Sequence, residues 1–236
     1  MILILKTGIT YKSIKTQYGD FEDWIIGKMS LKEGEYLIHK TENFQTLPPN
    51  NNYTGIVITG SHSMVTDIEP VENRMCSWLV NAHDNGIPIL GICYGHQLLS
   101  FIFGGTVSYN GMGIVIGSEN TLLTAEGKKD KLLGELPSNF KVYKAHKQSV
   151  SHLPKSAEIL SINKSGVIDA FRFNISTWGV QFHPEFDQNI TKAYINELSE
   201  ELAGEGRDVL NLSDEVVDVA YGSKLLKRFK QITEKV

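Results

Sequence analysis

The stretch GIPILGICYGHQLLSFIFGG, residues 86–105, decides how this chain folds. It opens with a short apolar run of strand length, Ile87–Leu90. Beyond Cys93, apolar residues such as Leu98 and Ile102 recur at helical spacing. The stretch therefore predicts a strand that turns sharply into a helix, with the cysteine in the turn.

Cys93 is flanked by Gly91 and Gly95, which is the spacing of the G-x-S-x-G nucleophile elbow with sulfur in place of oxygen. In such an elbow a strained turn projects the nucleophile above the edge of a sheet. Glycine is needed because a Cβ would collide with the neighbouring strand and helix. The alternative is that Cys93 is a small buried hydrophobic residue at the end of a core strand, since such cysteines are often buried. The second half of the chain bears on this choice.

The composition describes an ordinary globular protein of 236 residues, with 41% hydrophobic and 21% charged residues. Because α/β folds of this length are routinely one domain, we expect one domain over residues 1–236, with residues 188–236 as a helical C-terminal extension. The net charge of −4 gives no basic surface for nucleic acid, and no apolar run approaches the length of a membrane-spanning helix. We therefore expect neither a nucleic-acid partner nor a membrane.

The two cysteines, Cys76 and Cys93, occur without a C-x-x-C motif, which argues against a disulfide framework and a zinc site. Cys76 lies beside the apolar face of a predicted helix and is expected to pack in the core. The N-terminal MILILKTG has too short an apolar run for a secretion signal. The histidines lack an H-E-x-x-H pattern. We expect a cytoplasmic protein with no metal and no cofactor.

Strands alternate with helices through the first half of the chain. This alternation predicts an α/β three-layer sandwich, with a mostly parallel open sheet flanked by helices. The elbow would then lie at the carboxyl ends of the strands, where ligands bind in such sheets. The predicted strands are residues 2–5, 35–39, 55–59 and 87–90, and the predicted helices are residues 19–29 and 71–83.

After Gly105 the pattern changes to shorter strand-like runs, and an Asn110-Gly111 pair lies between residues 106–109 and 114–116. Asn-Gly between such runs is a strong hairpin signal, so we expect a small antiparallel portion after the elbow helix. The segment from Gln188 is charged and mostly helical, and it could cover the cleft or dock a neighbouring protein. Further strands are predicted at residues 140–143, 158–162, 167–173 and 177–182, and the helical tail is interrupted near residues 204–208.

A second group of chemistry-bearing residues follows the strand predicted at residues 177–182. Pro184 cannot continue a ladder, so this strand stops at His183. Glu185 is two residues further on in extended backbone, which puts both side chains on the same face. A carboxylate beside an imidazole fixes its tautomer and stabilises the imidazolium, as in a catalytic triad. The alternative is a histidine that ends a strand and a glutamate that caps a helix, but one geometry with Cys93 explains both motifs.

GICYGHQLL and, later in the chain, GVQFHPEF resemble the paired motifs of the class I glutamine amidotransferases. Both are most similar to the amidotransferase part of GMP synthase and its free-standing relatives. The resemblance covers residues 55–186. It implies that Cys93 is the nucleophile, that His183 is the general base and acid, and that Glu185 orients His183.

The resemblance also implies roles for residues around the nucleophile. The backbone N–H groups of Gly60 and Tyr94 would form the oxyanion hole. The segment AHKQSV, residues 145–150, resembles the H-x-D-S-V loop that holds the α-amino and carboxylate ends of the substrate, with Gln148 where aspartate is more usual. A further departure is Val115, where relatives tend to carry an acid in a G-x-E-x-G pattern. The implied substrate-binding residues are Gln97, His146, Gln148, Ser149 and Val150.

These expectations point to an enzyme that hydrolyses the side-chain amide of glutamine through a γ-glutamyl thioester on Cys93 and releases ammonia. The chain has no G-x-x-x-x-G-K-[ST] motif to activate an ammonia acceptor with ATP, so the ammonia would pass to a separate synthetase. An alternative is a free-standing hydrolase of γ-glutamyl peptides or conjugates, because the same acyl-enzyme forms whichever amine departs. A third interpretation is an inactive binding protein that keeps the fold, although a complete triad argues against it.

Overall fold

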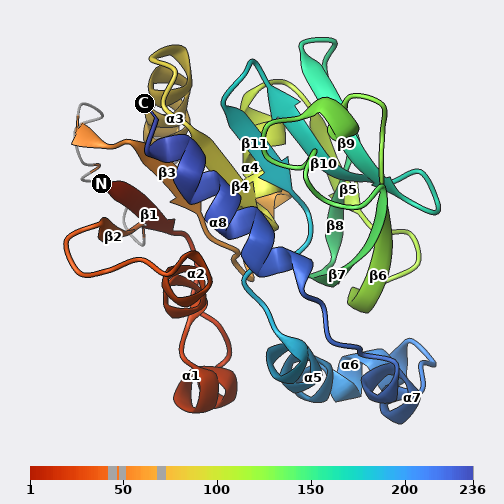
Figure 1. The fold of residues 1–236 in the computed structure, drawn as a ribbon. Coiled ribbons are helices and arrows are strands. Elements are labelled where there is room, and N and C mark those ends of the chain that lie inside the picture. Colours follow the sequence, from red (N-terminus) through yellow and green to blue (C-terminus); the bar gives the residue numbers. More distant parts are fainter. Residues whose placement is uncertain (42–46, 48–51, 68–72, 236) are drawn as a thin grey trace.

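A computed structural model of the chain describes residues 1–41, 47, 52–67 and 73–235. Figure 1 shows a central sheet with helices against both of its faces. The strands are β1 (Ile2–Lys6), β2 (Tyr36–Lys40), β3 (Gly55–Ile58), β4 (Ile89–Ile92), β5 (Thr106–Tyr109), β6 (Val115–Leu123), β7 (Asn139–His146), β8 (Gln148–His152), β9 (Ala157–Asn163), β10 (Ile168–Phe173) and β11 (Thr177–Val180). The helices are α1 (Lys12–Tyr18), α2 (Phe21–Met29), α3 (Asn73–Asp84), α4 (Tyr94–Ile102), α5 (Gln188–Glu197), α6 (Ser199–Gly204), α7 (Val209–Asp214) and α8 (Tyr221–Thr233).

The main sheet of the described residues has nine strands in the order β2-β1-β3-β4-β11-β10-β9-β6-β7. The first five strands in this order are parallel to one another. The remaining strands pair antiparallel and extend the same sheet. The α/β prediction is thereby confirmed. The parallel half brings the carboxyl ends of β1, β3, β4 and β11 to one edge, where such sheets bind ligands.

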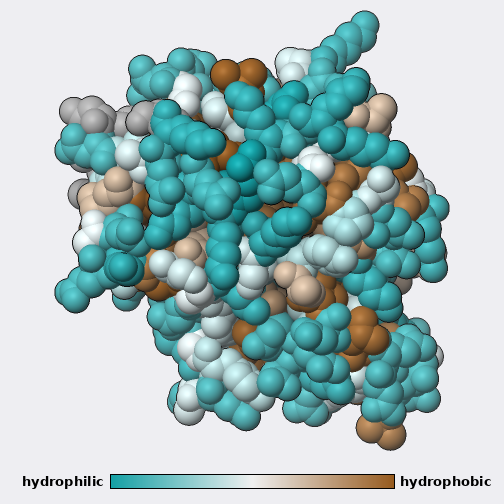
Figure 2. Space-filling model, in the orientation of Figure 1, coloured by the Kyte–Doolittle hydropathy of each residue, from teal (hydrophilic) through white to brown (hydrophobic). Residues whose placement is uncertain are grey.

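Alternating apolar residues of the strands bury both faces of the parallel half, as the period of two in a strand requires. One face, with Ile4 and Ile92, packs against Ile25 of α2 and Phe229 of α8. The other face packs against helices α3 and α4. Helix α8 crosses the first face, and hydrophilic residues cover most of the surface on that side of the molecule (Figures 1 and 2).

The strand after α4 does not form the hairpin that the Asn110-Gly111 pair predicts. β5 pairs antiparallel with β8 in a separate two-stranded sheet, whereas β6 pairs with β7 and β9 in the main sheet. Val107 of β5 lies opposite Val150 of β8, and both are buried in the core. The turn, in which Gly113 has a φ of +80°, carries the chain from the small sheet to the large one. The hairpin prediction is wrong because burial of Val107, rather than the local turn, selects the partner of β5.

The C-terminal segment is helical, as predicted, with an interruption between Gly204 at the end of α6 and Val209 at the start of α7. Helix α5 packs against α1, β6 and β7, and Figure 1 shows α5, α6 and α7 together below the sheet. Helix α1 was not predicted. The start of the helix predicted at residues 71–83 and the proline-rich loop at residues 48–49 lie partly or wholly outside the described residues. No helix in the described part of the chain is both long enough and apolar enough to cross a bilayer.

Candidate active site

Cys93 lies in the turn between β4 and α4, with the unusual backbone angles φ +50° and ψ −96°. A positive φ is strained for a residue other than glycine, so the surrounding structure must hold it in place. The amide of Cys93 donates to the carbonyl of Val180 in β11 over 2.9 Å, and its carbonyl accepts from the amide of Gln97 over 3.1 Å. The sheet and the helix thus fix the cysteine from both sides.

The two glycines that flank Cys93 are packed too tightly for a side chain. A Cβ added at Gly91 would collide with the backbone carbonyl of Gly95 in α4. A Cβ added at Gly95 would lie 2.8 Å from the carbonyl oxygen of Ile58 in β3. The glycine pair therefore allows helix and strand to approach closely, which is the reason that the sequence motif suggests.

His183 and Glu185 follow β11 at the same edge of the sheet. The Nδ1 atom of His183 lies 2.7 Å from Oε1 of Glu185, and both side chains are buried. The imidazole stacks on Phe186, with ring centroids 4.0 Å apart, and faces Phe21 at 6.3 Å. A Cβ at Gly60 would lie 3.2 Å from Cε1 of the imidazole. The ring is therefore held in one plane.

Cys93 and His183 interact directly. Burial lowers the pKa of His183, but the charges of Glu185 and Cys93 and hydrogen bonds to both raise it to about 10. The imidazolium is therefore the stable form of His183 at neutral pH. The tertiary structure brings together the three residues that the two motifs contribute from distant parts of the chain.

The proposed oxyanion-hole residues lie on either side of this group. Gly60 directly follows β3, and its carbonyl accepts from the hydroxyls of Thr7 and Thr59 at 3.3 and 3.0 Å. Tyr94 is the first residue of α4, and an amide in the first turn of a helix lies outside the intrahelical hydrogen-bond pattern. The arrangement places backbone amides at the carboxyl edge of the sheet near the sulfur of Cys93.

A chain of side-chain amides contacts the sulfur of Cys93. The Nε2 atom of Gln181 lies 3.7 Å from Sγ, and Oε1 of Gln181 accepts from Nε2 of Gln97 over 3.2 Å. Gln97 also donates to the carbonyl of Gln148 over 2.7 Å. Gln181 was not among the site residues predicted from the sequence. The period of two along β11 could have found it, because this period puts Gln181 on the same face as His183.

The predicted substrate loop at residues 145–150 is only partly at the site. The side chains of His146 and Gln148 line a cavity beside Cys93, whereas those of Ser149 and Val150 do not. Val150 packs in the core. Gln148 donates from Nε2 to the hydroxyl of Thr66 over 2.7 Å, a contact that no sequence pattern predicted. Burial, with the nearby charge of Lys144, lowers the pKa of His146 to about 3, so its ring is neutral.

The cavity encloses about 570 Å³ of space, part of it open to solvent. Val115 is absent from its lining, although the preceding residue contributes to it. The C-terminal segment forms part of the wall through α5 and the residue after it. The lining residues are Tyr11, Ser61, His62, Ser63, Met64, Cys93, Gln97, Ile114, Ala145, His146, Lys147, Gln148, Tyr194 and Leu198. Among the described residues, no group of three or more His, Cys, Asp or Glu side chains could hold a metal ion.

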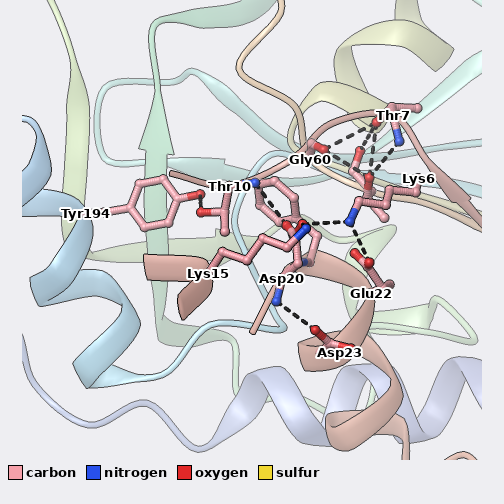
Figure 3. Close-up of polar contacts among 11 residues, drawn as sticks. Lys6, Thr7, Thr10, Lys15, Asp20, Glu22, Asp23, Gly60 and Tyr194 are labelled. Carbon is pink, nitrogen blue, oxygen red and sulfur yellow. Dashed lines mark hydrogen bonds and ion pairs between the residues drawn. The ribbon is translucent and has the colours of Figure 1, made fainter. Parts of the chain in front are cut away.

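A buried ion pair supports the loop between β1 and α2 (Figure 3). Nζ of Lys6 lies 2.6 Å from Oδ2 of Asp20. The other carboxylate oxygen of Asp20 accepts from the amides of Thr10 and Phe21 at 2.9 Å. The hydroxyl of Thr10 lies 2.7 Å from that of Tyr194 in α5. The pair thus positions two aromatic side chains, one beside the imidazole and one in the cavity wall.

Comparison with known protein families matches residues 24–199 to the family described as glutamine amidotransferase class-I. A γ-glutamyl peptidase 5 of Arabidopsis thaliana is 30% identical over 142 residues, which are 59% of this chain and 57% of that protein. The glutamine-hydrolysing component of a GMP synthase of Pyrococcus abyssi is 34% identical over 137 residues, which are 57% of this chain and 67% of that protein. A γ-glutamyl-L-1-hydroxyisopropylamide hydrolase of a Pseudomonas species is 28% identical over 79% of this chain and 64% of its own length. The chain thus spans little more than half to two thirds of these relatives.

Solved structures share the fold at low sequence identity. A glutamine amidotransferase from Thermotoga maritima superposes with a TM-score of 0.73 and 19% identity, covering 100% of this chain and 96% of that one. A glutamine amidotransferase from Methylobacillus flagellatus has a TM-score of 0.77 and 16% identity, covering 99% and 94% of the two chains.

Proposed function

Because this chain belongs to the class-I glutamine amidotransferase family, we propose that it hydrolyses the γ-amide bond of glutamine or of a γ-glutamyl compound. Cys93 would be the nucleophile, His183 the general base and acid, and Glu185 the group that orients His183. The observation that carries the proposal is the hydrogen-bonded series from Cys93 through His183 to Glu185, next to an open cavity.

The reaction would proceed through an acyl-enzyme. The thiolate of Cys93 adds to the γ-carbonyl carbon, and the amides of Gly60 and Tyr94 stabilise the negative oxygen. The imidazolium of His183 then protonates the leaving nitrogen, which departs as ammonia or an amine and leaves a γ-glutamyl thioester. His183, now neutral, takes a proton from water as the water attacks the thioester. Collapse of this second intermediate releases glutamate and restores the thiolate.

Replacement of the nucleophile tests the proposal directly. We expect Cys93→Ala to abolish glutamate release from glutamine and from γ-glutamyl dipeptides, with a loss on the order of a thousandfold or more. Cys76→Ala is the matched control, because Cys76 lies on α3 and packs against the core away from the cavity. Undiminished glutamate release by a folded Cys93→Ala protein would overturn the assignment of the nucleophile.

The relatives favour two uses of this chemistry. Similarity to the glutamine-hydrolysing component of a GMP synthase supports a glutaminase that passes ammonia to a separate synthetase. Similarity to a γ-glutamyl peptidase and to a γ-glutamyl amide hydrolase supports a free-standing hydrolase. The purified chain distinguishes them: a glutaminase component is expected to turn over glutamine, and to do so faster with its synthetase. A free-standing hydrolase is expected to prefer substituted γ-glutamyl amides without a partner.

An inactive binding protein that keeps the fold is the remaining alternative. A glutamine analogue that carries an electrophile in place of the side-chain amide distinguishes this case, because an active thiolate forms a covalent adduct with it. We expect labelling of Cys93 that is blocked by an excess of a γ-glutamyl substrate. An unlabelled Cys93 in the folded protein would favour the inactive interpretation.

A further inference from the structure

Aromatic side chains form a closed circuit of ring contacts that includes His183. His183 contacts Phe186 at 4.0 Å between ring centroids, and Phe186 contacts Tyr194 at 5.0 Å. Tyr194 contacts Tyr11 at 5.6 Å, and Tyr11 contacts His62 at 4.2 Å. The circuit closes from His62 to Phe21 at 6.4 Å and from Phe21 back to His183 at 6.3 Å. The rings come from segments far apart in the sequence, so only the tertiary structure assembles them.

Three of these rings, Tyr11, His62 and Tyr194, line the cavity beside Cys93, and together we call them the aromatic wall. The apolar side chains of Ile114 and Leu198 line the same cavity. Ile114 and Tyr194 belong to one buried cluster, against which Tyr11 and Leu198 pack. The cavity therefore has a continuous apolar surface on the side that carries the histidine.

The polar part of the cavity is built from a different set of contacts. Gln97 and Gln148 line the cavity and are joined by a hydrogen bond, and Gln97 is linked through Gln181 to the sulfur of Cys93. The neutral ring of His146 lies with its Nδ1 atom 2.9 Å from the carbonyl oxygen of Gln148, to which it donates. One set of side chains thus surrounds the nucleophile with amides, and the other surrounds the imidazole with aromatic rings.

The direction of the substrate follows from the proton transfer. A group that protonates a leaving nitrogen must lie within hydrogen-bond reach of it, so this nitrogen lies next to His183. Any substituent on the nitrogen starts from the same place, where the nearest lining side chains are those of the aromatic wall. The amino-acid end of the γ-glutamyl group, on the other side of the scissile bond, then faces the amides.

We propose that the aromatic wall, with Leu198 and Ile114, binds an apolar substituent on the leaving nitrogen, so that the substrates of this chain are γ-glutamyl amides of apolar or aromatic amines. This inference rests on the proposed function and narrows its substrate class. The apolar substituent leaves water and packs on the rings, and binding of this kind discriminates by on the order of ten- to a hundredfold. Glutamine, whose leaving nitrogen carries no substituent, gains nothing from the wall.

A series of amides tests the proposal on the unmodified protein. We compare kcat/KM for γ-glutamylbenzylamide, γ-glutamylethylamide, glutamine and γ-glutamylglycine, whose leaving group carries a carboxylate. Benzylamine and ammonia have similar basicity, so that comparison isolates binding of the substituent. We expect benzylamide to exceed glutamine by about tenfold or more. Faster hydrolysis of glutamine or of γ-glutamylglycine would overturn the inference, whereas hydrolysis of none of the four would contradict the proposed function itself.

Variants of the wall locate the effect. Leu198 and Tyr11 are half-buried, so their truncation is expected to leave the fold intact. Leu198→Ala and Tyr11→Ala are expected to lower the ratio of kcat/KM for benzylamide over glutamine by about three- to tenfold. The matched controls are Leu210→Ala, at an exposed leucine on α7 outside the cavity, and Tyr11→Phe, which keeps the ring. A ratio that stays unchanged in both alanine variants of the wall would show that the substituent binds elsewhere.

Discussion

The Nε2 atom of Gln181 lies 3.7 Å from the Sγ atom of Cys93, although 88 residues separate the two in the sequence. Gln97 fixes the orientation of this amide by donating to its oxygen. An N–H group aimed at sulfur stabilises negative charge on it. We therefore expect Gln181→Leu to slow alkylation of Cys93 by iodoacetamide at neutral pH by about tenfold.

The control for this prediction is Gln231→Leu, which removes the same side chain from an exposed position on α8. It is expected to leave the alkylation rate as in the wild type. Equal rates in both variants would mean that the amide of Gln181 has no influence on the thiolate.

Neutralising Glu185 is expected to change the pH dependence of the enzyme. Burial lowers the pKa of His183, and the charge of Glu185 is the largest of the influences that raise it to about 10. In Glu185→Gln the pKa of His183 falls, so the imidazolium is lost at a lower pH. We expect kcat to fall on the order of a hundredfold or more, and the alkaline limb of the kcat/KM profile to move to lower pH.

Glu185→Asp is the companion variant, because it keeps the charge and shortens the side chain. We expect its alkaline limb to stay closer to that of the wild type than the limb of Glu185→Gln. If the two variants have the same profile, charge on this residue does not control the titration.

Loss of the Lys6–Asp20 pair is expected to destabilise the fold. Burial raises the pKa of Asp20, but hydrogen bonds from Lys6, Thr10 and Phe21 outweigh it and lower the pKa below 3.8. Asp20→Asn leaves the Lys6 cation buried without this partner, and we expect a loss of about 3 kcal/mol in the free energy of unfolding at pH 7. Chemical denaturation measures it.

The pH dependence distinguishes the charge of Asp20 from its packing. A carboxylate with a lowered pKa stabilises the fold above its unfolded pKa, and this stabilisation is lost as the pH falls through the folded pKa. The difference between wild type and Asp20→Asn is therefore expected to shrink below about pH 4. A difference that is constant from pH 7 to pH 3 would assign the effect to packing alone.

His96 is expected to make the fold acid-sensitive. Burial lowers its pKa from 6.5 to about 3, so the unfolded chain binds a proton that the folded chain excludes. Stability is therefore lost as the pH falls below 6.5, by about 1.4 kcal/mol per pH unit from this group. We expect His96→Phe, which keeps a ring against Phe171, to reduce the slope of unfolding free energy against pH by that amount.

The exposed His152 provides the control, since His152→Phe is expected to retain the wild-type slope between pH 6.5 and pH 4. A slope in His96→Phe equal to that of the wild type would contradict the assignment of acid sensitivity to His96.

Much of the site was predictable because its parts are local. The strand-to-helix turn at Cys93 follows from an apolar run, two glycines and helical spacing, all within one stretch of sequence. The common face of His183 and Glu185 follows from the period of two in extended backbone. The hairpin at Asn110-Gly111 was predicted wrongly, because its turn signal is local but the burial of Val107 against Val150 depends on distant segments.

The sequence by itself determined the α/β class, the turn that holds Cys93 and the motif that holds His183, because each depends on backbone periodicity and on glycine at close approaches. The tertiary structure alone decided that Gln181 reaches the sulfur, and that Tyr11, His62 and Tyr194 meet in one wall beside the imidazole. These contacts join side chains from separate elements. Their positions are set by strand order and by helix packing on the sheet, which no local pattern specifies.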